Sequence, residues 1–300
     1  MHGQKVEAAY IRALQQFREA VTHSLEAGTI NGPALVRLAI HDATTYDCKT
    51  NTSGTNGSIR TKKELEQPGN ENLSSVVAAL AKAKHAFSSL THADAIQQAA
   101  VVAIQAAGGP TISITPGRQD SWTFPPPGLL FAPVPGDDQQ SVTAIRAFAN
   151  RTGLLLRAVV ALMGASSYSR WWGQNQHDKL VSKPGAFDNS FFRSLVEGRS
   201  PSDGWLLSDE ELRHYCEEYA ADQTLFFKDY AVAHEEMSRL GTRLHPTTAA
   251  ALAAAHAADA SLWESLTPLQ TAAACIIAGG VVAIGVGAWW NRRRRLRRIV

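Results

Sequence analysis

The chain has 300 residues, of which 45% are hydrophobic and 19% charged, and its formal net charge is +2. This composition is that of a globular protein and excludes a disordered or fibrous one. Six arginines stand among the last nine residues, and removing these six positive charges from the total of +2 leaves −4 for the rest. Such a distribution argues against a nucleic-acid-binding protein, which spreads Lys and Arg over one face. The three cysteines are far apart, so they exclude a disulfide scaffold and give no support to a zinc site.

Apolar residues recur at helical spacing through most of the chain, which predicts a mainly α fold. The segment 91–107 is expected to begin with a capping pair, Thr91 and Asp94. The segment 111–138 is rich in proline and glycine and is expected to be an ordered loop. The predicted helices cover 6–27, 33–44, 73–88, 91–107 and 153–164, with one or two long helices over 208–240.

Residues 271–290 form an uncharged apolar stretch long enough to cross a bilayer, because about twenty residues at 1.5 Å each span a ~30 Å hydrocarbon core. Trp289 and Trp290 stand where an interfacial aromatic belt belongs, and the arginine cluster follows at once. A buried core helix is the alternative, but such a helix seldom ends in RRRRLRR. We therefore predict a globular domain over 1–241, an Ala-rich connector over 242–270, one transmembrane helix over 271–290 and a basic tail over 291–300.

The order of these segments favours a tail-anchored membrane protein, since residues 1–23 contain no apolar signal segment. The positive-inside rule favours a mitochondrial membrane with the basic tip in the matrix. A peroxisomal membrane is the alternative, because basic tails also follow peroxisomal tail anchors. Gly279, Ala283 and Gly287 form a stripe suited to close helix packing, which indicates protein partners in the membrane; ordinary Gly and Ala usage in a membrane helix explains the stripe equally well.

Arg37 and His41 are the first candidates for chemistry, because a spacing of four residues puts both on one face of a helix. A neutral imidazole takes a proton from peroxide, and a neighbouring cation stabilises the charge on the departing oxygen. Taken alone, such a pair is more often a surface or capping pair.

The segments around this pair resemble the class I haem peroxidases, the family of ascorbate and cytochrome c peroxidases. The resemblance covers residues 6–241 and is most specific in GGP and PGRQDS, within 108–121, and in EEYAAD and FFKDYAVAH, within 217–234. The ascorbate peroxidase branch fits best, and some of its members end in a membrane span with a basic tail. The resemblance implies a helical peroxidase domain that binds haem b.

The same resemblance assigns roles to single residues. It implies that Arg37 is the distal arginine, His41 the distal base and Asn70 the residue that orients this base. Asp203, in PSDGWLL, corresponds to the carboxylate that hydrogen-bonds the proximal histidine.

Several positions depart from the family pattern, most of them on the proximal side. The proximal ligand position holds Ser166, and a neutral hydroxyl is a poor ligand for haem iron. His177 is the nearest substitute in sequence, and Arg170 is a loose candidate for the ascorbate-binding arginine. The remaining departures are Ile40 and Leu180 at tryptophan positions, Thr29 and Asn31 at the reductant site, and Val181 and Lys183 in a cation loop, where we expect the Lys183 ammonium to replace the ion.

Two functions follow from these observations. The first is a catalytically inactive, membrane-anchored accessory or structural subunit of an organellar membrane complex, in which Arg37, His41 and Asn70 persist as a buried polar network. The alternative is a haem-dependent peroxidase that reduces hydrogen peroxide, in which Arg37 and His41 cleave the O–O bond. Residue 166 discriminates between them, because a family-like enzyme needs a strong axial ligand there.

Overall fold

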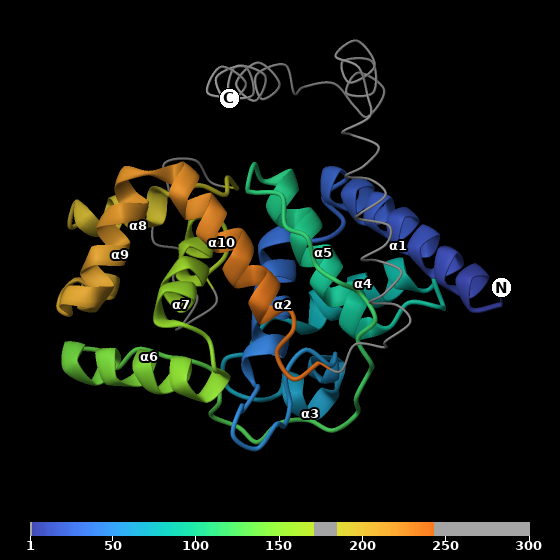
Figure 1. The fold of residues 1–300 in the computed structure, drawn as a ribbon, viewed down its shortest axis with the longest axis horizontal. Helices are drawn as coiled ribbons and strands as arrows, with labels where there is room; N and C mark the ends of the chain where they lie inside the picture. Colours follow the sequence, from blue (N-terminus) through green and yellow to red (C-terminus); the bar gives the residue numbers. More distant parts are fainter. Residues whose placement is uncertain (1, 171–184, 243–300) are drawn as a thin grey trace, which may run out of the picture. The chain divides into compact units, whose positions relative to one another are not determined.

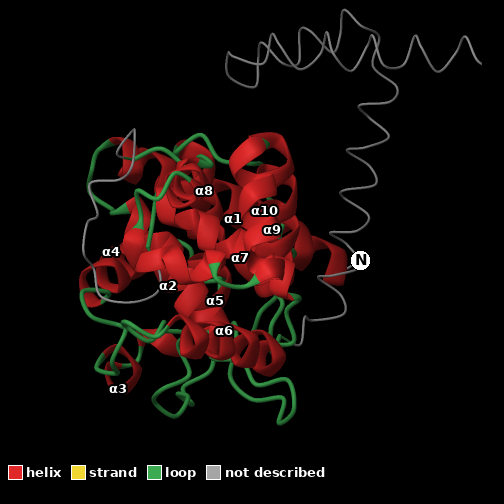
Figure 2. Cartoon of the chain, turned by 90° about the vertical axis from the view of Figure 1, so that its left-hand side faces the viewer, coloured by secondary structure: helices red, strands yellow, loops and turns green. Residues whose placement is uncertain are grey.

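The computed structural model describes residues 2–170 and 185–242, which belong to the first of two compact units, Met1–Ala249 and Ala250–Val300. These residues form a mainly helical domain (Figure 1, Figure 2), as the sequence predicts. In the described ranges the one extended pairing is a bridge between Asp47 and Thr52. The helices are α1 (His2–Glu26), α2 (Gly32–Thr44), η1 (Ser58–Arg60), α3 (Lys62–Leu65), α4 (Ser74–Lys84), α5 (His92–Ala106), α6 (Asp138–Thr152), α7 (Leu156–Met163), η2 (Gly164–Ser167), α8 (Ser190–Val196), η3 (Pro201–Leu207), α9 (Glu210–Ala221) and α10 (Gln223–Met237).

Helices α2 and α5 form the centre of the core. Eleven of the thirteen residues of α2 and twelve of the fifteen of α5 are buried. Asn31 caps α2 by accepting a hydrogen bond from the backbone of Ala34, and Thr91 caps α5 by accepting one from Asp94, which confirms the predicted start of that helix. The two helices pack along their lengths, and α1 covers α5 on the other side. The helix that carries Arg37 and His41 is therefore held on a rigid support.

The other helices form a second group around an aromatic cluster. In Figure 1, α6 to α9 gather on the left and α1, α4 and α5 on the right, with α2 and α10 between them. Phe187 contacts Tyr230 at a ring-centroid distance of 4.7 Å, and Phe192 contacts Tyr219 at 5.1 Å. Burial of such rings stabilises this side of the domain.

The structure contains three α-helices that were not predicted, α3, α6 and α8, and it moves the start of α7. Asp137 caps the start of α6, and Gly153, with φ +77°, ends it in the left-handed conformation. Because Gly153 ends α6, the following helix begins at Leu156 instead of residue 153. The stretch 208–240 forms two helices, one of the two predicted arrangements, since Asp222 has an extended backbone and caps α10 with its side chain.

The C-terminal end of α10 is tied to distant loops. Arg118 is buried, pairs with Asp94 at 2.9 Å, and donates two hydrogen bonds to the carbonyl of Ser238. The backbone N–H of Thr55 donates to the carbonyl of Leu240 at 2.9 Å. Residues 238–240, which follow α10, are therefore fixed to the domain by hydrogen bonds to residues far away in the sequence.

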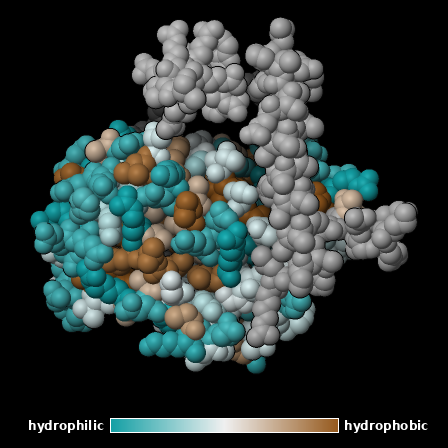
Figure 3. All heavy atoms as spheres, in the orientation of Figure 1, coloured by the Kyte–Doolittle hydropathy of each residue, from teal (hydrophilic) through white to brown (hydrophobic). Residues whose placement is uncertain are grey.

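The predicted transmembrane helix lies outside the described residues. Within 2–170 and 185–242, none of the helices combines the length and the apolar character needed to cross a membrane. Hydrophilic side chains prevail on the face drawn in Figure 3, with apolar residues gathered in a smaller patch.

Candidate functional site

Helix α2 holds the two predicted distal residues one turn apart. Arg37 is 7% exposed and His41 2% exposed, so both lie inside the domain instead of on a solvated face. This burial excludes the surface-pair interpretation, because a cation and an imidazole are seldom buried without partners.

His41 is fixed by Asn70. The Nδ1 atom of His41 lies 2.8 Å from Oδ1 of Asn70, and the Asn70 amide nitrogen donates to the carbonyl of Glu64 at 2.8 Å. Because this donation leaves the amide oxygen as the acceptor, the proton of a neutral His41 sits on Nδ1. The lone pair then belongs to Nε2, which is the arrangement of a general base.

Arg37 binds the backbone of the same loop. Its Nη1 donates to the carbonyl of Glu71 at 2.9 Å and its Nη2 to the carbonyl of Gly69, while the Glu71 carboxylate lies 3.8 Å away. Burial lowers the pKa of Arg37, and the Glu71 charge opposes this effect. Gly69 has φ +96°, and a Cβ there would lie 2.8 Å from Leu130, so this backbone requires glycine. The predicted trio of Arg37, His41 and Asn70 is thus brought together by the loop 69–71.

A pair of buried acids lies beside this network. Asp42 follows His41 in α2 and accepts a hydrogen bond from the backbone of Gly57 at 3.1 Å. Burial raises the pKa of Asp42 to about 7, and burial together with the charge of Asp42 raises the pKa of Glu64 to about 8. The Ser58 hydroxyl has a smaller, opposing effect on Glu64 but forms no hydrogen bond of normal geometry with it. Glu64 is therefore largely neutral at pH 7.

The predicted proximal position, Ser166, lies at a tight junction between helices. Helix α7 ends at Met163 and continues into η2, which contains Ser166. A Cβ at Gly164 would lie 2.3 Å from the ring of Phe226 and 2.6 Å from that of Phe192, so glycine allows this close approach. Within the described part of the chain, the buried hydroxyl of Ser166 has no hydrogen-bond partner.

Asp203 is bound to Arg170. The two Nη atoms of Arg170 donate to the two carboxylate oxygens at 2.7 and 3.2 Å, which is a bidentate pair. Ser200 donates to the same carboxylate at 2.8 Å and Ser202 at 3.3 Å. The side chain of Asp203 is only 1% exposed, so these donors compensate a buried charge.

These contacts place several of the predicted residues without testing their roles. Arg170, considered above for ascorbate binding, pairs with Asp203, and its role toward ascorbate stays a prediction. Asn31 caps α2, and Ile40 is fully buried in the core. Glu64 was missed, although it opens the segment ELEQPGNENL, which belongs to the family resemblance. His177, Leu180, Val181 and Lys183 lie outside the described residues.

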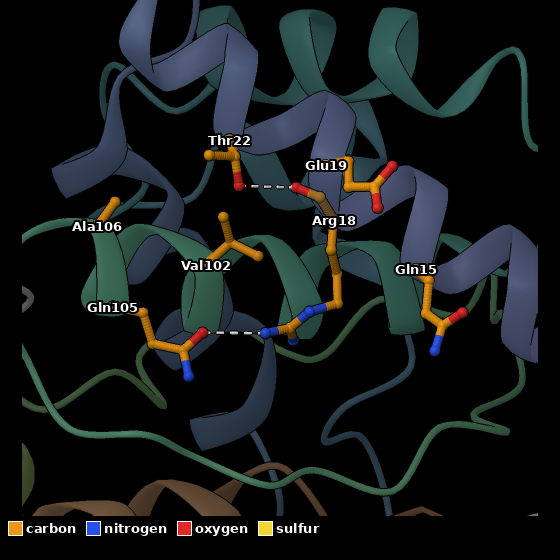
Figure 4. A pocket seen from close by; sticks show the side chains of 7 residues that line it. All are labelled: Gln15, Arg18, Glu19, Thr22, Val102, Gln105 and Ala106. Atoms are coloured by element: carbon orange, nitrogen blue, oxygen red, sulfur yellow. Dashed lines mark hydrogen bonds between the residues drawn. The ribbon is translucent and has the colours of Figure 1, made fainter. Parts of the chain in front are cut away.

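A separate hollow lies between α1 and α5 (Figure 4). Its volume is about 660 Å³, and it contains none of the residues discussed above. Arg18 crosses it and donates to the side-chain oxygens of Gln98 at 2.6 Å and Gln105 at 2.9 Å. These bonds join the two helices, so the hollow is explained as part of their packing.

Comparison with known proteins identifies the class. A profile of the family described as Peroxidase matches residues 17–222, more than half of the chain. The chain therefore belongs to the peroxidase family. Membership implies haem b as the cofactor.

Similar individual proteins indicate the branch of this family to which the chain is related. L-ascorbate peroxidase 3 of Arabidopsis thaliana is 34% identical over 97% of this chain and 98% of its own length. The probable peroxisomal L-ascorbate peroxidase 4 of Oryza sativa subsp. japonica is 34% identical over 91% of this chain and 94% of its own length. The peroxisomal L-ascorbate peroxidase 5 of Arabidopsis thaliana is 36% identical over 79% and 85%. The resemblance to the ascorbate peroxidase branch of the class I enzymes is thus confirmed.

Proposed function

We propose that this chain is a membrane-anchored member of the ascorbate peroxidase branch that does not hold haem through a proximal histidine, and that it acts as an accessory subunit of a membrane complex. The observation that carries the proposal is the bidentate pair between Arg170 and Asp203. In the family pattern this carboxylate accepts the hydrogen bond of the proximal histidine, and here a guanidinium takes that role.

The chemistry of the proximal residues supports this proposal. A carboxylate that hydrogen-bonds an axial imidazole makes it a stronger donor to the iron. Ser166 supplies a neutral hydroxyl, which is a poor ligand, and Asp203 is already engaged by Arg170 and two serines. The distal residues are those that the family resemblance associates with haem, whereas the proximal residues do not fit haem ligated by histidine.

The distal network has a structural explanation in the absence of catalysis. The loop 69–71 is bound on one side by His41 through Asn70 and on the other by Arg37 through two carbonyls. Deletion of one member of a buried polar network leaves its partner unsatisfied, which costs about 1–3 kcal/mol. Stability alone is therefore sufficient reason to retain the three residues.

The membrane anchor rests on the apolar stretch 271–290. The similarity to the Arabidopsis relative covers 97% of the chain, so it must include most of this stretch. Two relatives carry the word peroxisomal in their names, which supports the peroxisomal membrane over the mitochondrial one favoured by charge alone. The packing stripe in the same stretch supports a protein partner.

The second candidate is a haem-dependent peroxidase that reduces hydrogen peroxide. The tautomer that Asn70 imposes on His41 favours it, because Nε2 then has the lone pair that accepts a proton. Arg37 supplies the cation that stabilises a developing negative charge, after release from the carbonyls of Gly69 and Glu71.

An absorption spectrum of the purified full chain, titrated with haem, separates the two candidates. We expect no stoichiometric Soret band and no spectral change on addition of hydrogen peroxide. We expect Ser166→His together with Arg170→Ala to restore the band, since this double variant returns an imidazole and releases Asp203. Ser167→His is the matched control and restores nothing. A full Soret band in the unmodified chain that shifts with peroxide would overturn the accessory-subunit proposal.

A further inference from the structure

An exposed aromatic loop follows the buried Arg118. We define the aromatic loop as residues 121–128, with the sequence SWTFPPPG. Trp122 is 75% exposed and Phe124 39% exposed, and both are among the most exposed large apolar side chains in the described ranges. The loop is ordered, because the backbone of Ser121 donates to the carbonyl of Asn56 at 2.8 Å and Gln67 donates to that of Pro125 at 2.7 Å. A tryptophan this exposed on a fixed loop has a surface available to a partner.

Both rings of the aromatic loop lie against cations. The guanidinium carbon of Arg60 is 4.3 Å from the ring centroid of Trp122, and Nζ of Lys63 is 5.0 Å from that of Phe124. Neither Arg60 nor Lys63 forms an ion pair with a carboxylate within the described residues. The surface therefore combines aromatic rings with cations, of which Arg60 is influenced by the charges of Asp42 and Asp120.

The acidic side chains nearby have their own partners. Glu66 pairs with Lys62 at 3.7 Å, and Asp120 accepts hydrogen bonds from the backbone of His92 and Ala93. The charge of Asp120 acts on Arg60, so Lys63 is the excess charge of this surface, and an anionic partner is favoured.

The last described residue of the domain lies beside this loop. Thr242, the last described residue, hydrogen-bonds through its hydroxyl to that of Thr55. Asn56 follows Thr55 in the chain, and its backbone carbonyl accepts a hydrogen bond from the backbone N–H of Ser121. Ser121 directly precedes Trp122. The predicted connector to the apolar stretch 271–290 thus begins at the edge of the aromatic loop.

We propose that the aromatic loop, with Arg60 and Lys63, docks on the surface of a bilayer that contains anionic lipids. Tryptophan prefers the interface between headgroups and acyl chains, and lysine and arginine attract anionic headgroups. The choice of a lipid partner rests on the membrane anchor of the proposed function, because that anchor would keep the domain at a bilayer surface. Docking would fix the orientation of the domain on the membrane.

Brominated lipids provide the test. The full chain is reconstituted in vesicles made of equal parts phosphatidylcholine and phosphatidylserine, with bromine at a shallow acyl position. Subtraction of the emission of Trp122→Phe from that of the unmodified chain isolates the signal of Trp122 from the other six tryptophans. We expect this signal to be quenched by the brominated lipid, and we expect high salt or omission of phosphatidylserine to weaken the quenching.

A matched control places the same reporter elsewhere. Val196 is 43% exposed at the end of α8, which lies at the opposite end of the domain from α3 in Figure 1 and Figure 2. The double variant Trp122→Phe, Val196→Trp should give a new signal that the brominated lipid does not quench. Equal quenching at both positions would overturn the proposal, because it would indicate contact without a defined orientation.

Two further outcomes also decide against docking. An unquenched Trp122 in a chain that resists alkaline extraction from the vesicles would overturn docking and leave the anchor intact. Shielding of Trp122 from iodide in native membranes but not in pure lipid vesicles would identify a protein partner instead of lipid. Extraction of the chain at alkaline pH bears on the anchor alone, since the quenching is measured at neutral pH.

Discussion

Replacement of Glu64 by glutamine should stabilise the protein at alkaline pH. Folding raises the pKa of Glu64 from 4.5 to about 8, so the folded state binds this proton more tightly than the unfolded chain does. The contribution of Glu64 to the unfolding free energy is therefore highest below about pH 4.5 and falls as the pH rises to about 8. The full shift is equivalent to about 5 kcal/mol. Asp42 and Glu64 influence each other's ionisation, so only part of this energy is gained when Glu64 alone is replaced. We expect Glu64→Gln to raise the unfolding free energy at pH 8 by about 2 kcal/mol.

Urea unfolding of the full chain in detergent, repeated from pH 4.5 to pH 8.5, measures this effect. The Glu64→Gln curve should depend less on pH than that of the unmodified chain and should lie above it at pH 8. Glu66→Gln is the control, since Glu66 is 64% exposed on its side chain and follows the same short helix, α3. Parallel curves for Glu64→Gln and the unmodified chain, or a lower stability of the variant at pH 8, would refute the reasoning.

Three other predictions concern the proximal and distal residues. Arg170→Ala should lower the unfolding free energy by about 2–3 kcal/mol, because it removes the bidentate cation from a buried carboxylate, and Asp203→Asn should cost less; equal and additive costs in the double variant would contradict this. Nitrogen-15 NMR should find the proton of neutral His41 on Nδ1, and Asn70→Val should abolish that preference; a proton on Nε2 would reverse our assignment. Gly164→Ala should cost about 1–3 kcal/mol in thermal unfolding through its clash with the neighbouring rings, and an unchanged midpoint would contradict the packing described.

The central helices were predictable because local signals and burial agree there. Helix α5 begins at the predicted cap, Thr91, and ends before the paired glycines at 108 and 109. Helix α2 begins at Gly32, one residue from the prediction, after the cap at Asn31. In both helices almost every residue is buried, so the apolar pattern was dense enough to be recognised.

Helix α6 was missed because its pattern is weaker. Six of its fifteen residues are buried, and polar residues separate them. Its cap, Asp137, stands at the end of a segment that proline and glycine made a predicted loop. Gly153 was assigned to the start of the next helix, whereas its left-handed backbone ends this one. A cap at one end and a glycine at the other, sixteen residues apart, were the available signals.

The candidate site was predictable on one side only. The spacing of Arg37 and His41 and the resemblance at Asn70 identified the three distal residues, and the structure brings them together. The pairing of Arg170 with Asp203 was not predictable, because it joins residues 33 positions apart. The burial of Glu64 was hidden for a different reason, since KKELEQ has the composition of an exposed turn.

The hydrogen bonds that hold residues 238–240 to the domain have a mechanical consequence. Any tension on the chain beyond Thr242 is applied first to the carbonyls of Leu240 and Ser238. These carbonyls are held by Thr55 and Arg118, from which they are separated by 185 and 120 residues. Arg118 is paired with Asp94 in α5, so the force is transmitted to that helix. Among the described helices, α5 has the most buried residues. Force applied at this point is therefore resisted by the central helices. Helix α10 cannot unfold from its C-terminal end until those hydrogen bonds break.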